Sequence, residues 1–179
     1  MAKQRKKLLI VDGYNVLRSG SRYREITGPD YTDDAFNTAR ERLINDVVNY
    51  AGRDWRAIIV FDGAKNQFST GEAQSVGGVR IVFSPAGQSA DKVIEKLAHD
   101  ARERQVETLV VTSDATIQDT VFGNGVDRMS ADGFSHEVAL YYEDARLDET
   151  PKVAEKNTVA SRIDPSTLAK LKALRDAAR

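Results

Sequence analysis

The sequence predicts an α/β protein with a central, mainly parallel β-sheet flanked by helices. Two short apolar runs, at residues 8–11 and 57–61, are each followed directly by an aspartate, and a third run at 108–112 is followed by Ser113 and Asp114. Stretches with helical spacing of apolar residues lie between these runs. A strand, a helix and a second strand in this order form a right-handed parallel unit in nearly all proteins. At 179 residues the chain is long enough for one compact domain and a short appendage.

The first half of the chain predicts three strands and one long helix. Residues 8–11 form a buried strand, and the arginine-rich residues 18–30, with glycine and proline breakers, form a loop. A helix then begins near Asp33, a second buried strand covers 57–61, and the glycine-rich residues 71–78 lead to a third strand at 79–83. The helix is predicted from apolar residues at helical spacing, namely Phe36, Ala39, Leu43, Val47 and Tyr50.

The second half predicts a strand–helix–strand unit followed by helices. Ser89 precedes a strong helical pattern that ends before the strand at 108–112. A short helix at 115–122, a strand at 126–129 and a helix capped by Ser130 follow. We expect the domain to cover residues 1–148, with a linker and an amphipathic C-terminal helix in 149–179 that opens at Asp164-Pro165.

Composition excludes several classes of protein. The formal net charge of −1 gives no overall attraction to nucleic acid, so any such binding depends on local basic clusters. The absence of cysteine excludes disulfides, zinc–thiolate sites and thiol nucleophiles. No apolar run approaches the roughly 18 residues of a membrane helix or the about 7–15 of a signal peptide. We therefore expect a cytoplasmic protein with no membrane partner.

Acidic residues cluster at the predicted carboxyl ends of the strands. Asp12 and Asp114 follow two of the strands, and Asp91 and Glu95 lie four residues apart on the helix between them. Ligands of open parallel sheets bind outside the carboxyl ends of the strands, so these side chains should converge there. Several carboxylates at one edge repel each other, and a hard divalent cation relieves that repulsion. The sequence predicts a Mg²⁺ or Mn²⁺ site.

Each of these acidic residues also has an ordinary structural explanation. Asp91 and Glu95 fit a solvated helix face with lysines beside them. Asp12 fits an Asp-Gly turn, and Asp114 fits a helix cap. The roles of two further aspartates stay open at this stage, Asp62 after the second strand and Asp119 beyond Asp114. Both histidines, His99 and His136, are read as surface residues.

Phosphodiester hydrolysis is the chemistry that suits this set. The sequence contains no phosphate-binding glycine-rich loop of the nucleotide-binding types and no serine or cysteine nucleophile paired with histidine. A divalent ion can activate water and stabilise the leaving oxygen of a phosphodiester. Basic side chains on the flanking loops would grip backbone phosphates, or are ordinary surface charges. These candidates are Arg18, Arg22, Arg24 and Lys65.

Five motifs together resemble the YacP-like branch of NYN domains. They are Val-Asp-Gly-Tyr-Asn at 11–15, Phe-Asp-Gly at 61–63, Ser-Ala-Asp-Lys-Val-Ile-Glu at 89–95, Thr-Ser-Asp at 112–114 and Gly-Val-Asp-Arg-Met-Ser at 125–130. This resemblance covers residues 7–146, leaves 150–179 outside, and implies a three-layer PIN-like fold with a C-terminal helical extension. It implies a metal-dependent ribonuclease whose acidic centre is Asp12, Asp91, Glu95 and Asp114, supported by Asn15 and Ser113.

One departure from the family pattern bears on catalysis. Relatives commonly carry Glu-Gln after the Ser-Asp motif, and this chain has Ile117-Gln118. The missing glutamate puts one further metal ligand in question, and Asp119 is the nearest candidate to replace it.

The leading hypothesis is an endoribonuclease that cleaves single-stranded RNA with Mg²⁺ or Mn²⁺. The resemblance implies ribosome-bound mRNA as a substrate and the ribosome as a partner, which the residues alone do not select. The alternative is a catalytically inactive module of the same fold that binds RNA or the ribosome. A phosphatase with Asp12 as nucleophile is disfavoured, because enzymes of the haloacid-dehalogenase type need an aspartate where Tyr14 stands.

Overall fold

A computed structural model describes residues 6–63, 73–117, 121, 123 and 125–149 of the chain. The chain divides into two compact units, residues 1–142 and 143–179. The first unit contains the sheet and the residues of the candidate site. Whether a domain boundary falls near residue 149 stays a prediction. No helix in the described residues is long and apolar enough to cross a membrane.

The centre of the first unit is a mainly parallel sheet, as predicted. Its strands are β1 (Lys7–Asp12), β2 (Trp55–Phe61), β3 (Ala73–Val76), β4 (Val79–Phe83), β5 (Thr108–Val111) and β6 (Val126–Met129). Their order is β3-β4-β2-β1-β5-β6, and only β3 runs antiparallel to its neighbour. In the central register Ile10 pairs with Ile58 on one side and Val110 on the other. The carboxyl ends of β1, β2 and β5 therefore meet at one edge of the sheet.

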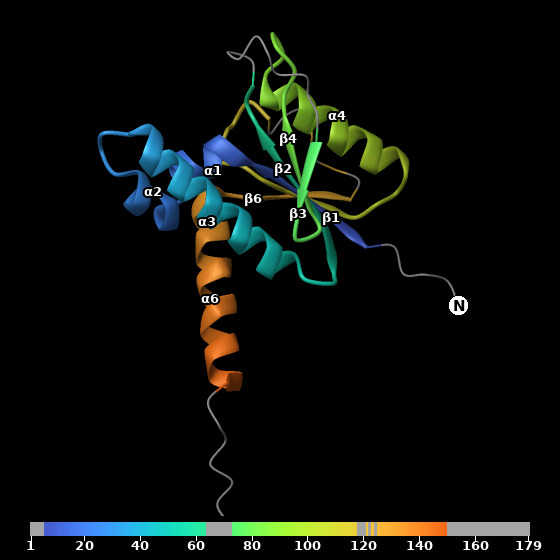
Figure 1. The fold of residues 1–179 in the computed structure, drawn as a ribbon. Coiled ribbons are helices and arrows are strands. Elements are labelled where there is room, and N and C mark those ends of the chain that lie inside the picture. The colour runs from blue at the N-terminus through green and yellow to red at the C-terminus, as the bar shows by residue number, and fades with distance from the viewer. Residues whose placement is uncertain (1–5, 64–72, 118–120, 122, 124, 150–179) are drawn as a thin grey trace, which may run out of the picture. The chain divides into compact units, whose positions relative to one another are not determined.

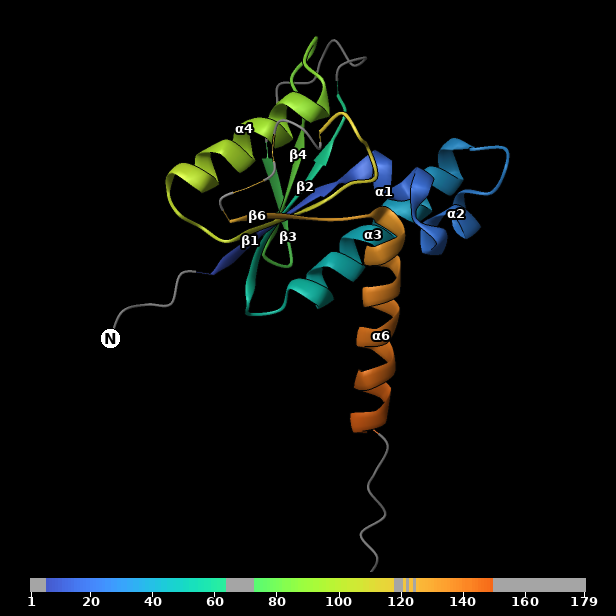
Figure 2. The same cartoon turned by 180° about the vertical axis from the view of Figure 1, so that it is seen from behind.

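Helices cover both faces of this sheet (Figures 1 and 2). One face carries α4 (Ala90–Glu103), and the other carries α1 (Gly13–Ser19), α2 (Ser21–Thr27), α3 (Asp33–Ala51) and the start of α6 (Ala131–Glu149). Alternation along β1 produces the two cores, because successive side chains of a strand point to opposite faces. Leu9 and Val11 pack with α1, α3 and α6, whereas Leu8 and Ile10 pack with α4.

The junction of β1 and α1 leaves no room for a side chain at its first helical residue. A Cβ atom on Gly13 would lie 2.4 Å from Cε1 of the buried Phe61. Glycine therefore lets α1 begin directly after Asp12, whose carboxylate caps the helix by accepting a hydrogen bond from the Asn15 N–H. The motif Asp-Gly-Tyr-Asn is a strand end and a helix start, and its Asp and Asn face the carboxyl edge of the sheet together.

One prediction for the polar segments was wrong, and one strand was not predicted. Residues 18–30, expected as a loop, contain the end of α1 and all of α2, because Tyr23 is buried against α3 and stabilises a helix that the local pattern does not show. Residues 71–78 contain β3, joined to β4 by Gly77 and Gly78 with φ of 55° and 85°. Paired positive φ values suit the tight turn of a hairpin.

The other expected elements in the described residues are confirmed. Ser130 caps α6 as predicted, with its Oγ accepting a hydrogen bond from the Gly133 N–H at 3.0 Å. The expected short helix at 115–122 falls partly, and the expected helix after Asp164 wholly, outside the described residues.

Candidate active site

Asp12 is the buried carboxylate at the carboxyl end of β1. It is 6% exposed, and burial raises its pKa from an ordinary 3.8 to about 6. Hydrogen bonds from the Asn15 N–H at 3.4 Å and the Thr112 hydroxyl at 3.2 Å act in the opposite direction. The negative charges of Asp91 and Asp114 raise its pKa further. A buried carboxylate with like charges nearby is electrostatically costly when ionised.

Asp91, in the first turn of α4, interacts electrostatically with Asp12 and with the other acidic side chains. Burial is the first cause of its raised pKa, and the charges of Asp114, Glu95 and Asp62 follow. Asp114 differs, because hydrogen bonds from the N–H and hydroxyl of Thr116, at 2.9 and 2.8 Å, lower its pKa. The fold thus brings together the acidic residues predicted from β1, α4 and the end of β5.

Three polar side chains tie the strand ends around Asp12. The Asn15 Oδ1 accepts a hydrogen bond from the Ser113 N–H at 2.7 Å, and the Ser113 Oγ accepts one from the Ala131 N–H of α6 at 2.9 Å. Thr112, fully buried, donates its hydroxyl to Asp12 and accepts the Asp114 N–H at 3.1 Å. This network fixes the backbone that carries the carboxylates.

The role of Thr112 was missed at the sequence level, although a signal for it exists. Val11 and Val111 are register partners in neighbouring parallel strands, so the next residues, Asp12 and Thr112, lie beside each other. A hydroxyl one residue beyond a strand end, next to a carboxylate one residue along the neighbouring strand, can be anticipated once strand order is known. The strand order itself comes from the tertiary structure.

The donor chemistry of the site fits a hard divalent ion. Its carboxylate oxygens are the ligands that Mg²⁺ and Mn²⁺ prefer, and a bound cation would relieve the mutual repulsion of Asp12, Asp91 and Asp114. Within the part of the chain that the structure describes, no three histidine or acidic side chains stand close enough to hold an ion.

Two further acidic candidates were left open by the sequence. Asp62, exposed after β2, has its Oδ1 3.4 Å from the Ser84 Oγ, and its charge acts on Asp91. It thus faces the same edge as the predicted centre. Asp119 lies outside the described residues, as does the basic candidate Lys65.

The three arginine candidates separate into two groups. Arg18 and Arg24 are exposed on α1 and α2, and the Arg18 guanidinium carbon lies 5.8 Å from the centre of the Tyr14 ring. Arg22 instead binds the fully buried Asp46 of α3 at 2.7 and 3.2 Å, and that carboxylate raises its pKa. The Tyr23 hydroxyl completes this cluster at 3.0 Å. Arg22 therefore already has a structural partner.

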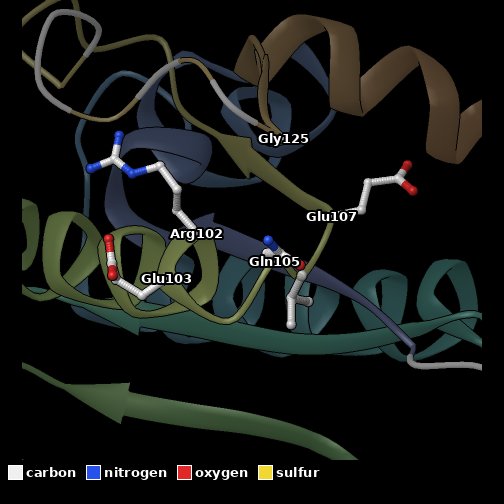
Figure 3. A pocket seen from close by; sticks show the side chains of 6 residues that line it. Arg102, Glu103, Gln105, Glu107 and Gly125 are labelled. Atoms are coloured by element: carbon white, nitrogen blue, oxygen red, sulfur yellow. The ribbon is translucent and has the colours of Figure 1, made fainter.

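An open pocket on the opposite edge of the sheet is separate from this site (Figure 3). It lies at the end of α4 and before the first residues of β5 and β6, whereas the carboxylates lie after the last residues of β1 and β5. Its lining residues are Arg102, Glu103, Gln105, Val106, Glu107 and Gly125.

A comparison with known families identifies the family of this chain. The YacP-like NYN domain family matches residues 9–176. The chain belongs to the YacP-like NYN domain family. NYN domains are generally nucleases, and such domains usually use divalent metals and act on RNA. The family match also extends beyond residue 146, so the expectation that residues 150–179 lie outside the resemblance was wrong for all but the last three.

Individual relatives agree with this assignment. The protein is 30% identical over 131 residues to a curated Bacillus subtilis (strain 168) protein described as "Uncharacterized protein YacP", covering 73% of this chain and 74% of the relative. The crystal structure of a point mutant of Rae1 (YacP) from Bacillus subtilis matches with a TM-score of 0.64 and 27% identity, covering 94% of this chain and 99% of that one. A second Rae1 structure gives 0.63 and 26%, covering 95% of each chain. The predicted fold class of this YacP-like protein is confirmed.

Proposed function

We propose that this YacP-like NYN protein is a metal-dependent endoribonuclease that hydrolyses single-stranded RNA with Mg²⁺ or Mn²⁺. The observation that supports it most strongly is the electrostatic coupling of Asp12, Asp91 and Asp114 at the carboxyl edge of the sheet. A fold gains nothing in stability from gathering like charges around a buried carboxylate. Such a cluster is typical of a site built for a cation and a phosphate.

The acidic residues and their neighbours have distinct roles in this proposal. Asp12, Asp91, Glu95 and Asp114 would hold the ion. Mg²⁺ or Mn²⁺ bound there supplies Lewis-acid activation of water and of the phosphoryl group. Asn15 and Ser113 hold the two strand ends at a fixed spacing through the 2.7 Å hydrogen bond between them. They are positioning residues.

Basic side chains on the helices that follow β1 would supply contacts to the RNA phosphates. The carboxylate cluster repels phosphate, so the chain around the scissile bond needs cationic contacts. Arg18 and Arg24 are exposed on the helices that follow β1 and are available for this role. Ribosome-bound mRNA is the substrate class we propose within single-stranded RNA, and the ribosome is the corresponding partner.

A cleavage assay tests the proposal. Purified protein is incubated with labelled linear and covalently circular single-stranded RNA, and with isolated ribosome–mRNA complexes, in Mn²⁺, Mg²⁺ or EDTA. We expect metal-dependent cleavage, including of the circle, which only an endonuclease can open. Asp91→Asn should reduce cleavage on the order of 100-fold or more. Asp100→Asn, an exposed aspartate later on the same helix, should leave it unchanged.

A second candidate function is RNA or ribosome binding without cleavage. The observation that favours it is Ile117, which stands where relatives commonly carry glutamate and is fully buried in the core beneath α4. The isoleucine side chain has no oxygen that could serve as a metal ligand. Intact RNA under every metal condition, with salt-dependent binding that survives Asp91→Asn, would establish this function in place of the nuclease.

A further inference from the structure

Thr112 joins two acidic residues of the candidate centre through a single side-chain atom. Its hydroxyl donates a hydrogen bond to Asp12 Oδ2 at 3.2 Å, and the same oxygen accepts one from the Asp114 N–H at 3.1 Å. Thr112 and Asp12 each lie one residue beyond a pair of register partners in β5 and β1. The hydroxyl therefore bridges the ends of two neighbouring strands.

The chemistry of the three groups fixes the direction of both hydrogen bonds. A backbone N–H can only donate, and an ionised carboxylate can only accept. The single hydroxyl hydrogen of Thr112 must therefore point to Asp12, while its oxygen faces the N–H of Asp114. The threonine thus presents one donor, in one orientation, to the buried carboxylate.

The surroundings of Thr112 hold this donor in place. The side chain is fully buried, and the Thr112 N–H donates to the Met129 carbonyl at the end of β6 at 2.9 Å. Branching at Cβ restricts rotation of the side chain further. The other oxygen of Asp12 accepts a longer hydrogen bond, 3.4 Å, from the Asn15 N–H. Contacts to both oxygens oppose rotation of the carboxylate, and we expect the shorter one, from Thr112, to contribute more.

A second buried threonine shows what an ordinary structural hydroxyl does in this sheet. Thr108, the first residue of β5, is 1% exposed, and its hydroxyl donates to the Val106 carbonyl at 2.8 Å. That hydrogen bond closes a local turn of the chain, two residues long. Thr112 instead connects residues that the proposed function assigns to ion binding. Groups that hydrogen-bond to metal ligands orient those ligands before the ion arrives.

We propose that Thr112 is a positioning residue that sets the orientation of the Asp12 carboxylate, and its spacing from the Asp114 backbone, for binding of Mg²⁺ or Mn²⁺. This rests on the proposed function and adds to it a residue that touches neither the ion nor RNA. A carboxylate oxygen has more than one lone pair, so the oxygen bonded to Thr112 can also bind an ion.

Two matched pairs of full-length proteins isolate the effect of the hydroxyl. The parent and Thr112→Val have side chains of similar shape, and Thr112→Ser and Thr112→Ala form a second, smaller pair. In each pair only the first member has the hydroxyl. Thr108→Val is the control, because it removes a buried hydroxyl from the other end of β5.

The main measurement is the affinity for Mn²⁺ in the absence of RNA. Isothermal titration with MnCl₂ is carried out at about pH 7.5 and about pH 8.5, both well above the ordinary pKa of a carboxyl group. Urea denaturation in EDTA establishes that each variant is folded. Cleavage of labelled single-stranded RNA is then measured as a function of Mn²⁺ concentration.

We expect Thr112→Val to weaken Mn²⁺ binding by about 10- to 100-fold, the usual range for loss of a group that orients a metal ligand. Thr112→Ser should bind Mn²⁺ on the order of 10-fold more tightly than Thr112→Ala. Thr108→Val should match the parent, and the loss in Thr112→Val should be the same at both pH values. Cleavage by Thr112→Val should need proportionally more Mn²⁺, with an unchanged KM for RNA once Mn²⁺ is saturating.

The outcomes separate this inference from the proposed function. If the parent binds Mn²⁺ and cleaves RNA while Thr112→Val binds Mn²⁺ equally well, the positioning role is wrong and the nuclease stands. Equal affinities of Thr112→Ser and Thr112→Ala would also overturn it, even if Thr112→Val does not fold. A loss that disappears at the higher pH would mean that a proton on Asp12 competes with the ion, which contradicts positioning. If the parent neither binds Mn²⁺ nor cleaves RNA, both proposals fall together.

Discussion

Replacing Asp12 by asparagine should make the metal-free protein more stable at neutral pH. The carboxylate is buried, and its pKa rises from 3.8 to about 6 in the folded protein. In the unfolded chain it ionises near its ordinary value. As pH rises above about 4, the unfolded state therefore loses a proton that the folded state still holds. Stability falls through this range and levels off above about pH 6.

The size of the effect follows from the pKa. A rise from 3.8 to about 6 corresponds to roughly 3 kcal/mol, at about 1.4 kcal/mol for each pH unit. Asparagine has no charge to bury, and its Oδ1 can still accept the hydrogen bond from the Asn15 N–H. Its amide nitrogen cannot accept the hydrogen bond from the Thr112 hydroxyl. The loss of that hydrogen bond costs about 1 kcal/mol and offsets part of the gain. The net gain for Asp12→Asn above about pH 7 is about 2 kcal/mol.

Urea denaturation in EDTA between about pH 4 and 8 measures the difference in free energy of unfolding between the parent and Asp12→Asn. The free energy of unfolding of the parent should fall relative to Asp12→Asn as the pH rises from about 4 to 6, and the two should converge near the lower limit. Asp127→Asn, an exposed residue on β6, is the control and should follow the parent. Added Mn²⁺ should stabilise the parent, by about 2.7 kcal/mol at about 100 times its dissociation constant, and should have less effect on Asp12→Asn. Parallel pH profiles for parent and variant would refute the reasoning.

Three further predictions concern other parts of the structure. Arg22→Ala should lower the free energy of unfolding by about 3–5 kcal/mol, because it leaves the fully buried Asp46 without its strongest partner. The double variant Arg22→Ala with Asp46→Asn should recover part of this loss. Both are measured by the same urea titration. Gly13→Ala should cost about 1–3 kcal/mol in thermal unfolding, because its Cβ would meet a phenylalanine ring at 2.4 Å; a neutral change would contradict that contact. Thr112→Val removes a buried donor to Asp12 and so raises the pKa of Asp12 in the folded protein only. In EDTA the upper end of the pH range over which stability falls should therefore move upward, and an unchanged profile would exclude this hydrogen bond as a determinant.

Much of the candidate site was predictable because its residues are attached to strand ends. Asp12 directly follows an apolar run and Asp114 lies three residues beyond the end of β5, and parallel strands bring their carboxyl ends to one edge whatever the details of packing. Asp91 was predictable as a member of that group because α4 has the clearest helical pattern and its first turn also faces the edge. The spacing of apolar residues and the position of polar ones are local signals, and they were sufficient to predict these elements.

The parts that the sequence did not reveal depend on contacts between distant residues. α2 is helical because Tyr23 and Arg22 bind Asp46 across more than twenty residues, and nothing local in residues 18–30 distinguishes that from a loop. Thr112 reaches Asp12 only because β5 lies beside β1, one hundred residues away.

The sequence by itself determined the α/β class, the main strands and the acidic character of the carboxyl edge, because each depends on the pattern of residues that are neighbours in the chain. The tertiary structure decided how those charges act on one another. Burial gave Asp12 its raised pKa, and strand order placed Thr112 beside it. The packing of α3 against α1 brought the rings of Tyr14 and Phe36 into contact. Electrostatic cost and ring packing depend on distances through space, and a linear sequence does not contain those distances.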